Sequence, residues 1–204
     1  MSLLIKNGEI VTAAERMHAD IYCEGETITR IGKGLDAPEG TTVVDAAGKY
    51  VFPGFIDPHV HIHLPFMGTL TKDTHRTGSQ AALVGGTTTY IEMLAPSRHE
   101  DLMAGYRLWN ELAEGNSACD YTFHIGVSKY DAEAEAQLRE IVADGMTSFK
   151  VFLSYKGFFG VNDEELFRTL TLAKELGVIV TAHCENDELV AQLQAQLLAA
   201  GRTG

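Results

Sequence analysis

From residue 51 onward the sequence alternates between short apolar segments and longer amphipathic segments, and this alternation restricts the fold more than any other feature. An apolar run of roughly four to eight residues predicts a buried strand, whereas apolar residues at helical spacing predict a helix. The predicted strands lie within YVFPGFIDPHVH, TTTYIEML, CDYTFHIGV, TSFKVFL and GVIVTAH, and a helical pattern follows each of them. Consecutive strand–helix units of this kind predict an α/β protein with a parallel sheet covered on both sides.

The predicted helices carry recognisable faces and ends. Asn162 has the side chain of an N-cap, and Gly177 is placed to end the helix that it begins. Acidic residues fill the first turn of the segment DAEAEAQLREIVADG, as a helix N-terminus prefers. One apolar face is expected in the segment EDLMAGYRLWNELAEG, formed by Leu102, Tyr106, Trp109 and Ala113.

Two architectures contain such a run of units, an open doubly wound sheet and a (β/α)8 barrel. The barrel needs eight units, and this chain supplies about five. The chain is therefore expected to be either an open sheet or the first part of a longer barrel protein, and the candidate site residues favour the barrel.

Residues 1–50 have a different pattern, made of short strands and turns. Asn7-Gly8 and Glu24-Gly25 are predicted to form hairpin turns in this part. The expected domains are therefore a small β module over 1–50 and a truncated α/β barrel over 51–204.

The charge balance excludes some classes of partner. Sixteen basic and 28 acidic residues give a net charge of −12, which argues against nucleic acid or an anionic membrane surface as a partner. No apolar run approaches the length of a membrane span.

The cysteines indicate a reducing compartment. Cys23, Cys119 and Cys184 are far apart and include no CxxC pair, so free thiols are expected. Cys184 is expected to be a small core-filling residue. The N-terminus has no signal-peptide pattern, and a cytoplasmic protein is expected.

Three of the eight histidines are concentrated in the segment FIDPHVHIHL. His59, His61 and His63 alternate, so a β-strand would direct them to one face. They could be a metal site, two metal ligands with a bystander, or a chance run.

Two further polar residues interrupt predicted strands. Lys150 lies inside the apolar run SFKVFL, and His183 ends VIVTAH. Burial favours the neutral amine of a lysine, and a neutral amine can add CO2 to become a carbamate that bridges two metal ions. Histidines nearby would supply neutral ligands for zinc. Taken singly, the lysine could be an edge residue and His183 a core histidine, but the joint pattern is much harder to obtain by accident.

Four segments carry a resemblance to a known family. PGFIDPHVHIHLPFMGT (53–69), GGTTTYIEM (85–93), SFKVFLSYKG (148–157) and TAHCEN (181–186) resemble the cyclic amidohydrolases, and within them the dihydropyrimidinase/hydantoinase family. The resemblance implies a (β/α)8 TIM-like barrel, with the N-terminal strands joining a β-sandwich beside it. It also implies a homo-oligomer, either a tetramer or a dimer.

The resemblance also implies the roles of site residues. His59 and His61 would bind one Zn²⁺, carboxylated Lys150 would bridge two, and His183 would bind the second. Tyr155 would hydrogen-bond the substrate and the oxyanion. The apolar pocket wall would comprise Leu64, Phe66, Phe152 and Phe159, although Phe152 and Phe159 could equally be ordinary core residues.

The implied reaction is hydrolysis of a cyclic amide or imide, a dihydropyrimidine or a 5-substituted hydantoin, to an N-carbamoyl amino acid. The family also uses a sixth-strand histidine and an eighth-strand aspartate, which these 204 residues do not include, so this chain alone is expected to be incomplete and inactive. His63 stands where the dihydroorotase relatives carry an arginine that binds substrate. Alternatives are an allantoinase, a dihydroorotase-type enzyme and a non-catalytic scaffold of the same family.

Overall fold

The computed structural model describes residues 1–66 and 68–203, and for Phe66 it describes the backbone only. The chain divides into two compact units, Met1–Phe55 and Ile56–Gly204. Each unit is considered by itself. Among the described residues, no helix is long and apolar enough to cross a membrane.

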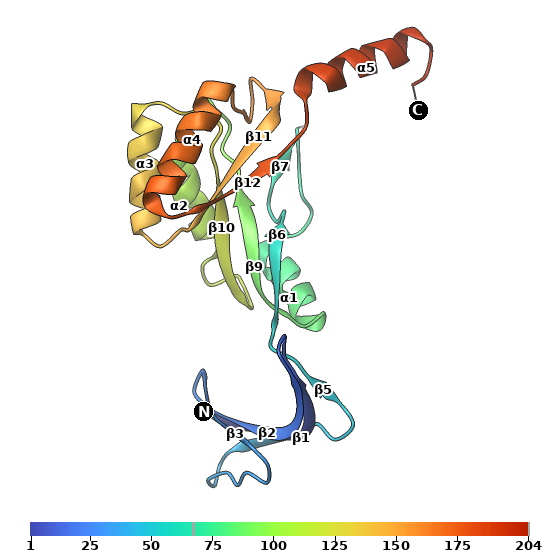
Figure 1. The fold of residues 1–204 in the computed structure, drawn as a ribbon, viewed down its shortest axis with the longest axis vertical. Helices are drawn as coiled ribbons and strands as arrows, with labels where there is room; N and C mark the ends of the chain where they lie inside the picture. The colour runs from blue at the N-terminus through green and yellow to red at the C-terminus, as the bar shows by residue number, and fades with distance from the viewer. Residues whose placement is uncertain (67, 204) are drawn as a thin grey trace. The chain divides into compact units, whose positions relative to one another are not determined.

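The N-terminal unit is a five-stranded sheet in which β1 pairs with β2, β4 and β5, and β3 pairs with β2 (Figure 1). β1/β2 and β2/β3 are antiparallel, whereas β4 and β5 run parallel to β1. The turn predicted at Glu24-Gly25 is confirmed, because Gly25 has a φ of 60° between β2 and β3. The strands are β1 (Ser2–Val11), β2 (Arg16–Glu24), β3 (Thr27–Gly32), β4 (Thr42–Asp45) and β5 (Tyr50–Val51).

The hairpin turn predicted at Asn7-Gly8 is wrong, because β1 continues through both residues with an irregular register. Asn7 has a left-handed φ of 64°. Its backbone N–H donates to Asp20 Oδ1 at 2.9 Å, and its side-chain Nδ2 donates to Asp45 Oδ1 at 2.9 Å. The dipeptide therefore forms a bulge within one strand, held by two carboxylates from neighbouring segments.

The C-terminal unit contains a second five-stranded sheet, in the order β12-β11-β10-β9-β6 (Figure 1). The pairs β9/β10, β10/β11 and β11/β12 are parallel, and the five predicted strand–helix units are confirmed. A two-stranded hairpin, β7/β8, follows β6. The strands are β6 (Phe55–Val60), β7 (Pro65–Phe66), β8 (Thr69–Leu70), β9 (Thr87–Leu94), β10 (Asp120–Gly126), β11 (Ser148–Lys156) and β12 (Ile179–His183). The helices are α1 (His75–Val84), α2 (Leu102–Ala113), α3 (Ala132–Ala143), α4 (Asp163–Leu176) and α5 (Asp187–Ala199).

The main core of this unit includes α2, α3 and α4 together with β9, β10 and β11. The predicted apolar face of α2 is confirmed, since all four of its residues are buried. Asn162 caps α4 in a capping box with Glu165, and Gly177 ends the helix with a φ of 71°. The local signals in the sequence thus determine where α4 begins and ends.

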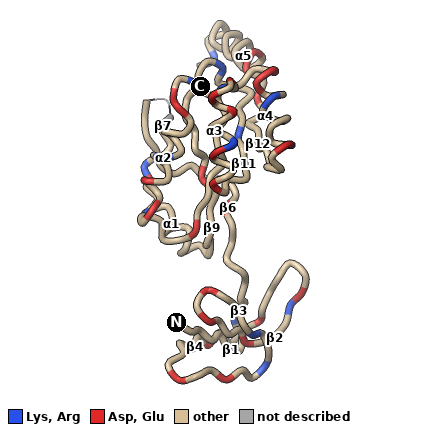
Figure 2. The backbone as a smooth tube through the Cα atoms, turned by 90° about the vertical axis from the view of Figure 1, so that its left-hand side faces the viewer, with Lys and Arg blue, Asp and Glu red and all other residues tan. Residues whose placement is uncertain are grey.

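The prediction that the strands are buried on both faces holds only for the middle of this sheet. β9, β10 and β11 are largely buried, whereas β6 is exposed along most of its length and β12 is partly exposed. None of the residues of α5 is buried. Figure 2 shows Lys and Arg scattered along the chain among Asp and Glu.

Candidate functional site

A cavity of about 240 Å³ lies at the carboxyl-terminal part of the parallel sheet. Its lining comes from β6, β9, β11, β12 and the segments that follow them. Parallel α/β proteins place their sites at this end of the strands because the connecting loops converge there. The lining residues are His59, His61, Leu64, Met93, Lys150, Phe152, Tyr155, Phe159 and His183.

His59 and His61 form a close pair at the end of β6. Their ring centroids lie 4.8 Å apart in an edge-to-face arrangement. Partial burial lowers the pKa of His59 to about 4, with the charges of Lys150 and His61 as further causes, although His59 and His61 are both exposed on their outer side. Burial, followed by Lys150, also lowers the pKa of His61. Both imidazoles are therefore neutral at neutral pH, which is the form that binds metal ions.

The third histidine of the segment departs from the strand pattern. β6 ends at Val60, and His63 has a left-handed φ of 59°. Its backbone N–H donates to the carbonyl oxygen of Asp73 at 3.2 Å. His63 is not among the residues that line the cavity, so simple alternation fails for it.

Lys150 reaches the same cavity from the middle of β11. The residue is only 7% exposed, and among the described residues no acidic side chain forms an ion pair with it. Its Nζ lies 5.4 Å from the ring centroid of Phe152. Burial lowers the pKa of this amine, against a smaller opposing effect of Cys184. A buried lysine of this kind is a good candidate for carbamate formation, because a larger fraction of its amine is neutral at a given pH than in an exposed lysine.

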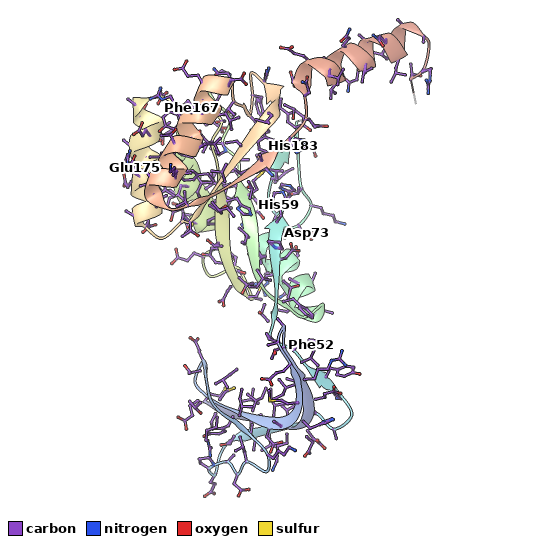
Figure 3. All side chains as sticks on the ribbon, in the orientation of Figure 1. Phe52, His59, Asp73, Phe167, Glu175 and His183 are labelled. Atoms are coloured by element: carbon purple, nitrogen blue, oxygen red, sulfur yellow. The ribbon has the colours of Figure 1, made fainter. Side chains whose placement is uncertain are left out.

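His183 lies at the end of β12, paired in register with Phe152 on β11. Its ring centroid lies 5.4 Å from that of Phe152 and 5.7 Å from that of Tyr155. Figure 3 labels His183 on β12 and His59 on β6. The sheet thus brings His59 and His183, which are more than 120 positions apart in the sequence, into the lining of one cavity together with Lys150.

Glu185 is a residue of this region that the sequence analysis missed. Its Oε2 lies 2.7 Å from His183 Nε2 and accepts a hydrogen bond from Ser154 Oγ at 3.3 Å. The hydrogen bond to His183 is the main cause that lowers the pKa of Glu185. Its position two residues after His183, inside TAHCEN, was the available signal.

Tyr155 is at the exposed rim of the cavity with a left-handed φ of 58°, a costly conformation for a residue with a side chain. Its backbone N–H donates to Asp187 Oδ1 at 2.9 Å. Its carbonyl oxygen accepts hydrogen bonds from the N–H groups of Phe158 and Phe159, each at 3.1 Å. These contacts hold the turn that presents the phenol ring beside Phe152 and His183.

The apolar side of the cavity is a small cluster separate from the main core. Leu64, Phe152 and Phe159 are buried in it with Met93 and Ala95. Phe152 and Phe159 therefore belong to a buried apolar cluster and also line the cavity, so the two alternatives given above, core residue and pocket wall, both describe them. Met93 was missed, although it lies within GGTTTYIEM.

Two further expectations have different outcomes. The side chain of Phe66 lies outside what the structure describes. Cys184 is exposed immediately after the end of β12, so its predicted core-filling role is wrong. All three cysteines are free, as predicted.

The cavity offers some of the groups that a metal centre needs, namely imidazole nitrogens, but no carboxylate lines it among the described residues. Among the described residues, no three His, Cys, Asp or Glu side chains are close enough to hold a metal ion by themselves. The cavity instead combines a pair of imidazoles, a single imidazole and a buried lysine amine. Neutral imidazoles are suitable zinc ligands, and a carbamate on Lys150 would add the anionic oxygens that this set lacks.

Comparison with known proteins identifies the family. Residues 50–200 match the model of the amidohydrolase family. The chain belongs to the amidohydrolase family. Amidohydrolases are metal-dependent, in agreement with the kind of donors in the cavity.

Individual relatives narrow the resemblance within the amidohydrolases. The chain is 43% identical to the D-hydantoinase of Geobacillus stearothermophilus over 204 residues, which are all of this chain and 43% of that protein. It is 37% identical to a dihydropyrimidinase of Dictyostelium discoideum, over all of this chain and 41% of that protein. A solved structure of the D-hydantoinase (dihydropyrimidinase) from Thermus sp. superposes with a TM-score of 0.96 at 72% identity, covering 99% of this chain and 44% of that one.

These matches confirm the predicted fold and the predicted resemblance to hydantoinases and dihydropyrimidinases. The parallel sheet of this amidohydrolase corresponds to part of a hydantoinase TIM barrel. The chain spans less than half the length of the relatives that it matches.

Proposed function

We propose that the full-length protein that contains this chain hydrolyses a cyclic amide ring. The substrate is a dihydropyrimidine or a 5-substituted hydantoin, and the product is an N-carbamoyl amino acid. The observation that carries this proposal is the cavity itself, where three histidines and a buried lysine face an apolar wall and a tyrosine. Relatives with the names D-hydantoinase and dihydropyrimidinase support the choice of ring.

The proposed metal centre contains two zinc ions. His59 and His61 would hold one, His183 would hold the other, and Lys150 would bridge them as its carbamate. To form the carbamate, the Nζ lone pair forms a bond to the carbon of dissolved CO2, one C=O π bond opens to leave the negative charge on the oxygens, and the proton that Nζ loses goes to water. The lowered pKa of Lys150 supports this step, since the attacking amine must be neutral. When bound, the metal pair supplies activation of water and polarisation of the scissile carbonyl.

The remaining residues of the cavity would bind and orient the ring. The phenol of Tyr155 would donate a hydrogen bond to the oxyanion that develops on the attacked carbonyl. Phe152, Phe159 and Leu64 would contact the ring substituent, because they form the apolar side of the cavity. Phe66 would belong to the same wall, on the basis of the resemblance alone.

The domain organisation is part of this proposal. Residues 1–50 would contribute strands to a β-sandwich, and 51–204 would be the first part of the barrel. We also propose a cytoplasmic homo-oligomer, a dimer or a tetramer. The free cysteines support the reducing compartment. The oligomer is proposed on the basis of the resemblance; Phe167, labelled in Figure 3, is an exposed apolar residue on α4 that is available for a contact.

The decisive experiment is an assay of the full-length protein on dihydrouracil, 5-substituted hydantoins, allantoin and dihydroorotate. Ring opening of dihydrouracil or a hydantoin supports the proposal, whereas activity on dihydroorotate alone or allantoin alone refutes the choice of ring. A protein with no bound zinc and no activity on any of the four would support a scaffold instead.

The role of Lys150 has its own test. Lys150→Ala is expected to lose both the metal pair and the activity, while Lys156→Ala, an exposed lysine of the same strand, is expected to retain both. Metal content equal to wild type in the Lys150 variant would refute the carbamate.

A further inference from the structure

A buried histidine outside the cavity connects two of the strands that supply its lining. His124 lies on β10, is 5% exposed and is not among the cavity-lining residues. Its Nε2 lies 2.7 Å from the carbonyl oxygen of Pro58, and its Nδ1 lies 2.6 Å from Ser148 Oγ. Both ring nitrogens are therefore engaged, one with β6 and one with β11.

The two residues that contact His124 are close to the candidate metal ligands. Pro58 immediately precedes His59, and Ser148 lies two positions before Lys150, on the same face of β11. The ring of His124 also lies 5.7 Å from that of His59. A displacement of either contact would therefore move a ligand directly.

The connection to β6 is not part of the backbone ladder of the sheet. In the strand order, β9 lies between β10 and β6. The hydrogen bond from His124 to Pro58 thus crosses over β9 through the side chain. Backbone pairing sets the spacing of adjacent strands, whereas the His124 side chain links two strands that are not neighbours in the sheet.

The hydrogen-bond partners of His124 show which of its two ring nitrogens carries the proton. A carbonyl oxygen only accepts, so Nε2 of His124 carries hydrogen and donates to Pro58. In the neutral ring, Nδ1 then accepts the hydroxyl hydrogen of Ser148. The Ser148 hydroxyl therefore holds the tautomer that the bond to Pro58 requires.

We propose that His124 is a positioning residue that fixes the separation between the ligand pair on β6 and Lys150 on β11, through Pro58 and Ser148. This inference rests on the metal-dependent function proposed above. It assigns His124 no contact with the substrate and no proton transfer.

The test compares two substitutions of His124 in the full-length protein. His124→Leu removes both hydrogen bonds, whereas the amide nitrogen of His124→Gln can replace Nε2 as the donor to Pro58. The Leu variant is expected to release zinc to a chelator at least ten-fold faster and to lose at least ten-fold in kcat, with KM changed less than two-fold. The Gln variant is expected to recover part of both losses.

A matched control separates positioning from general stability. His75 is also buried, at 1% exposure, and its Nδ1 lies 2.9 Å from the hydroxyl of Tyr90, outside the cavity lining. His75→Leu is expected to lower the Tm of the metal-free protein without changing the rate of zinc release. Equal acceleration of zinc release in the two Leu variants at equal loss of Tm would overturn the inference.

A second, milder substitution keeps the test decisive if His124→Leu does not fold. Ser148→Ala removes only the hydroxyl that holds the tautomer and is expected to accelerate zinc release about three-fold. Its control is Ser79→Ala, a buried serine that accepts a hydrogen bond from the N–H of Ala118, with no expected change. Unchanged zinc release and kcat in Ser148→Ala overturn the inference alone, whereas a wild type without metal or activity overturns the proposed function as well.

Discussion

Glu92 on β9 is a buried carboxyl group whose ionisation is coupled to folding. The residue is 0% exposed, and its Oε2 accepts a hydrogen bond of 2.6 Å from the backbone N–H of Ile62. Its Oε1 has no hydrogen-bond partner in the part of the chain that the structure describes. Burial raises the pKa of Glu92 from 4.5 to about 8, against the opposing effect of backbone hydrogen bonds from Ile62 and Met93. At neutral pH the folded protein therefore keeps this group largely protonated.

The sign and the size of the effect follow from the two pKa values. Between pH 4.5 and 8 the folded state holds a proton on Glu92 that the unfolded chain releases, so stability falls as the pH rises through this window and is constant above it. The shift is about 3.5 pH units, and at about 1.36 kcal/mol per unit the loss is on the order of 5 kcal/mol. Glu92→Gln removes this loss because its amide has no proton to release.

The assay is thermal unfolding of the metal-free full-length protein from pH 5 to pH 9. The Tm of Glu92→Gln relative to wild type is expected to rise by several degrees between pH 5 and pH 9. Any constant effect of the added amide group cancels in this comparison. The exposed residue Glu111 provides the control, since Glu111→Gln is expected to give a pH-independent difference. A Tm difference for Glu92→Gln that is the same at pH 5 and pH 9 would refute the buried, protonated state.

Three further outcomes are expected. Gly160→Ala should displace the turn beside the cavity and reduce kcat/KM at least ten-fold, because a Cβ there would lie 2.4 Å from the carbonyl oxygen of Ser154; unchanged kinetics would contradict this. Asn162→Ala should cost about 1 kcal/mol of stability by removing the cap of α4, measured as a lower Tm. In metal-free protein, the lowered pKa of His59 contributes stability that is complete above pH 6.5 and is lost as the pH falls towards 4, so His59→Gln should show a weaker loss of Tm in acid than wild type.

The elements of the fold that depend on local sequence could be predicted from it. The five strand–helix units, the buried face of α2 and both ends of α4 follow from periodicity and capping within a few residues. The bulge at Asn7-Gly8 could not be distinguished from a hairpin turn. The carboxylates that hold it, Asp20 and Asp45, lie 13 and 38 residues away in the sequence.

The candidate site likewise contains residues that could be predicted from the sequence and residues that could not. His59, His61 and His183 are predicted from their places at strand ends and Lys150 from its place inside an apolar strand, and all four line one cavity. Their individual roles stay predictions.

Glu92 and His124 were not identified, because each is a lone polar residue within a strand. Their partners, Ile62 and Pro58, are 30 and 66 residues distant. Only the folded chain reveals that both partners belong to the segment around His59.

Buried hydrogen bonds from Glu92 and His124 hold the segment around His59, and they lie apart from the exposed turn at the rim of the cavity. Holding the metal ligands and contacting the substrate would therefore fall to different parts of the structure. The proposed ligand spacing would depend on His124 inside the sheet, whereas the exposed turn that carries Tyr155 would contact the substrate at the rim of the cavity. Surface loops tolerate substitution far better than buried hydrogen-bonded groups. On the proposed function, mutations at the exposed rim would change the rings that the full-length protein accepts while the buried attachments of its metal ligands stay intact, so laboratory selection for new substrates would start at that rim.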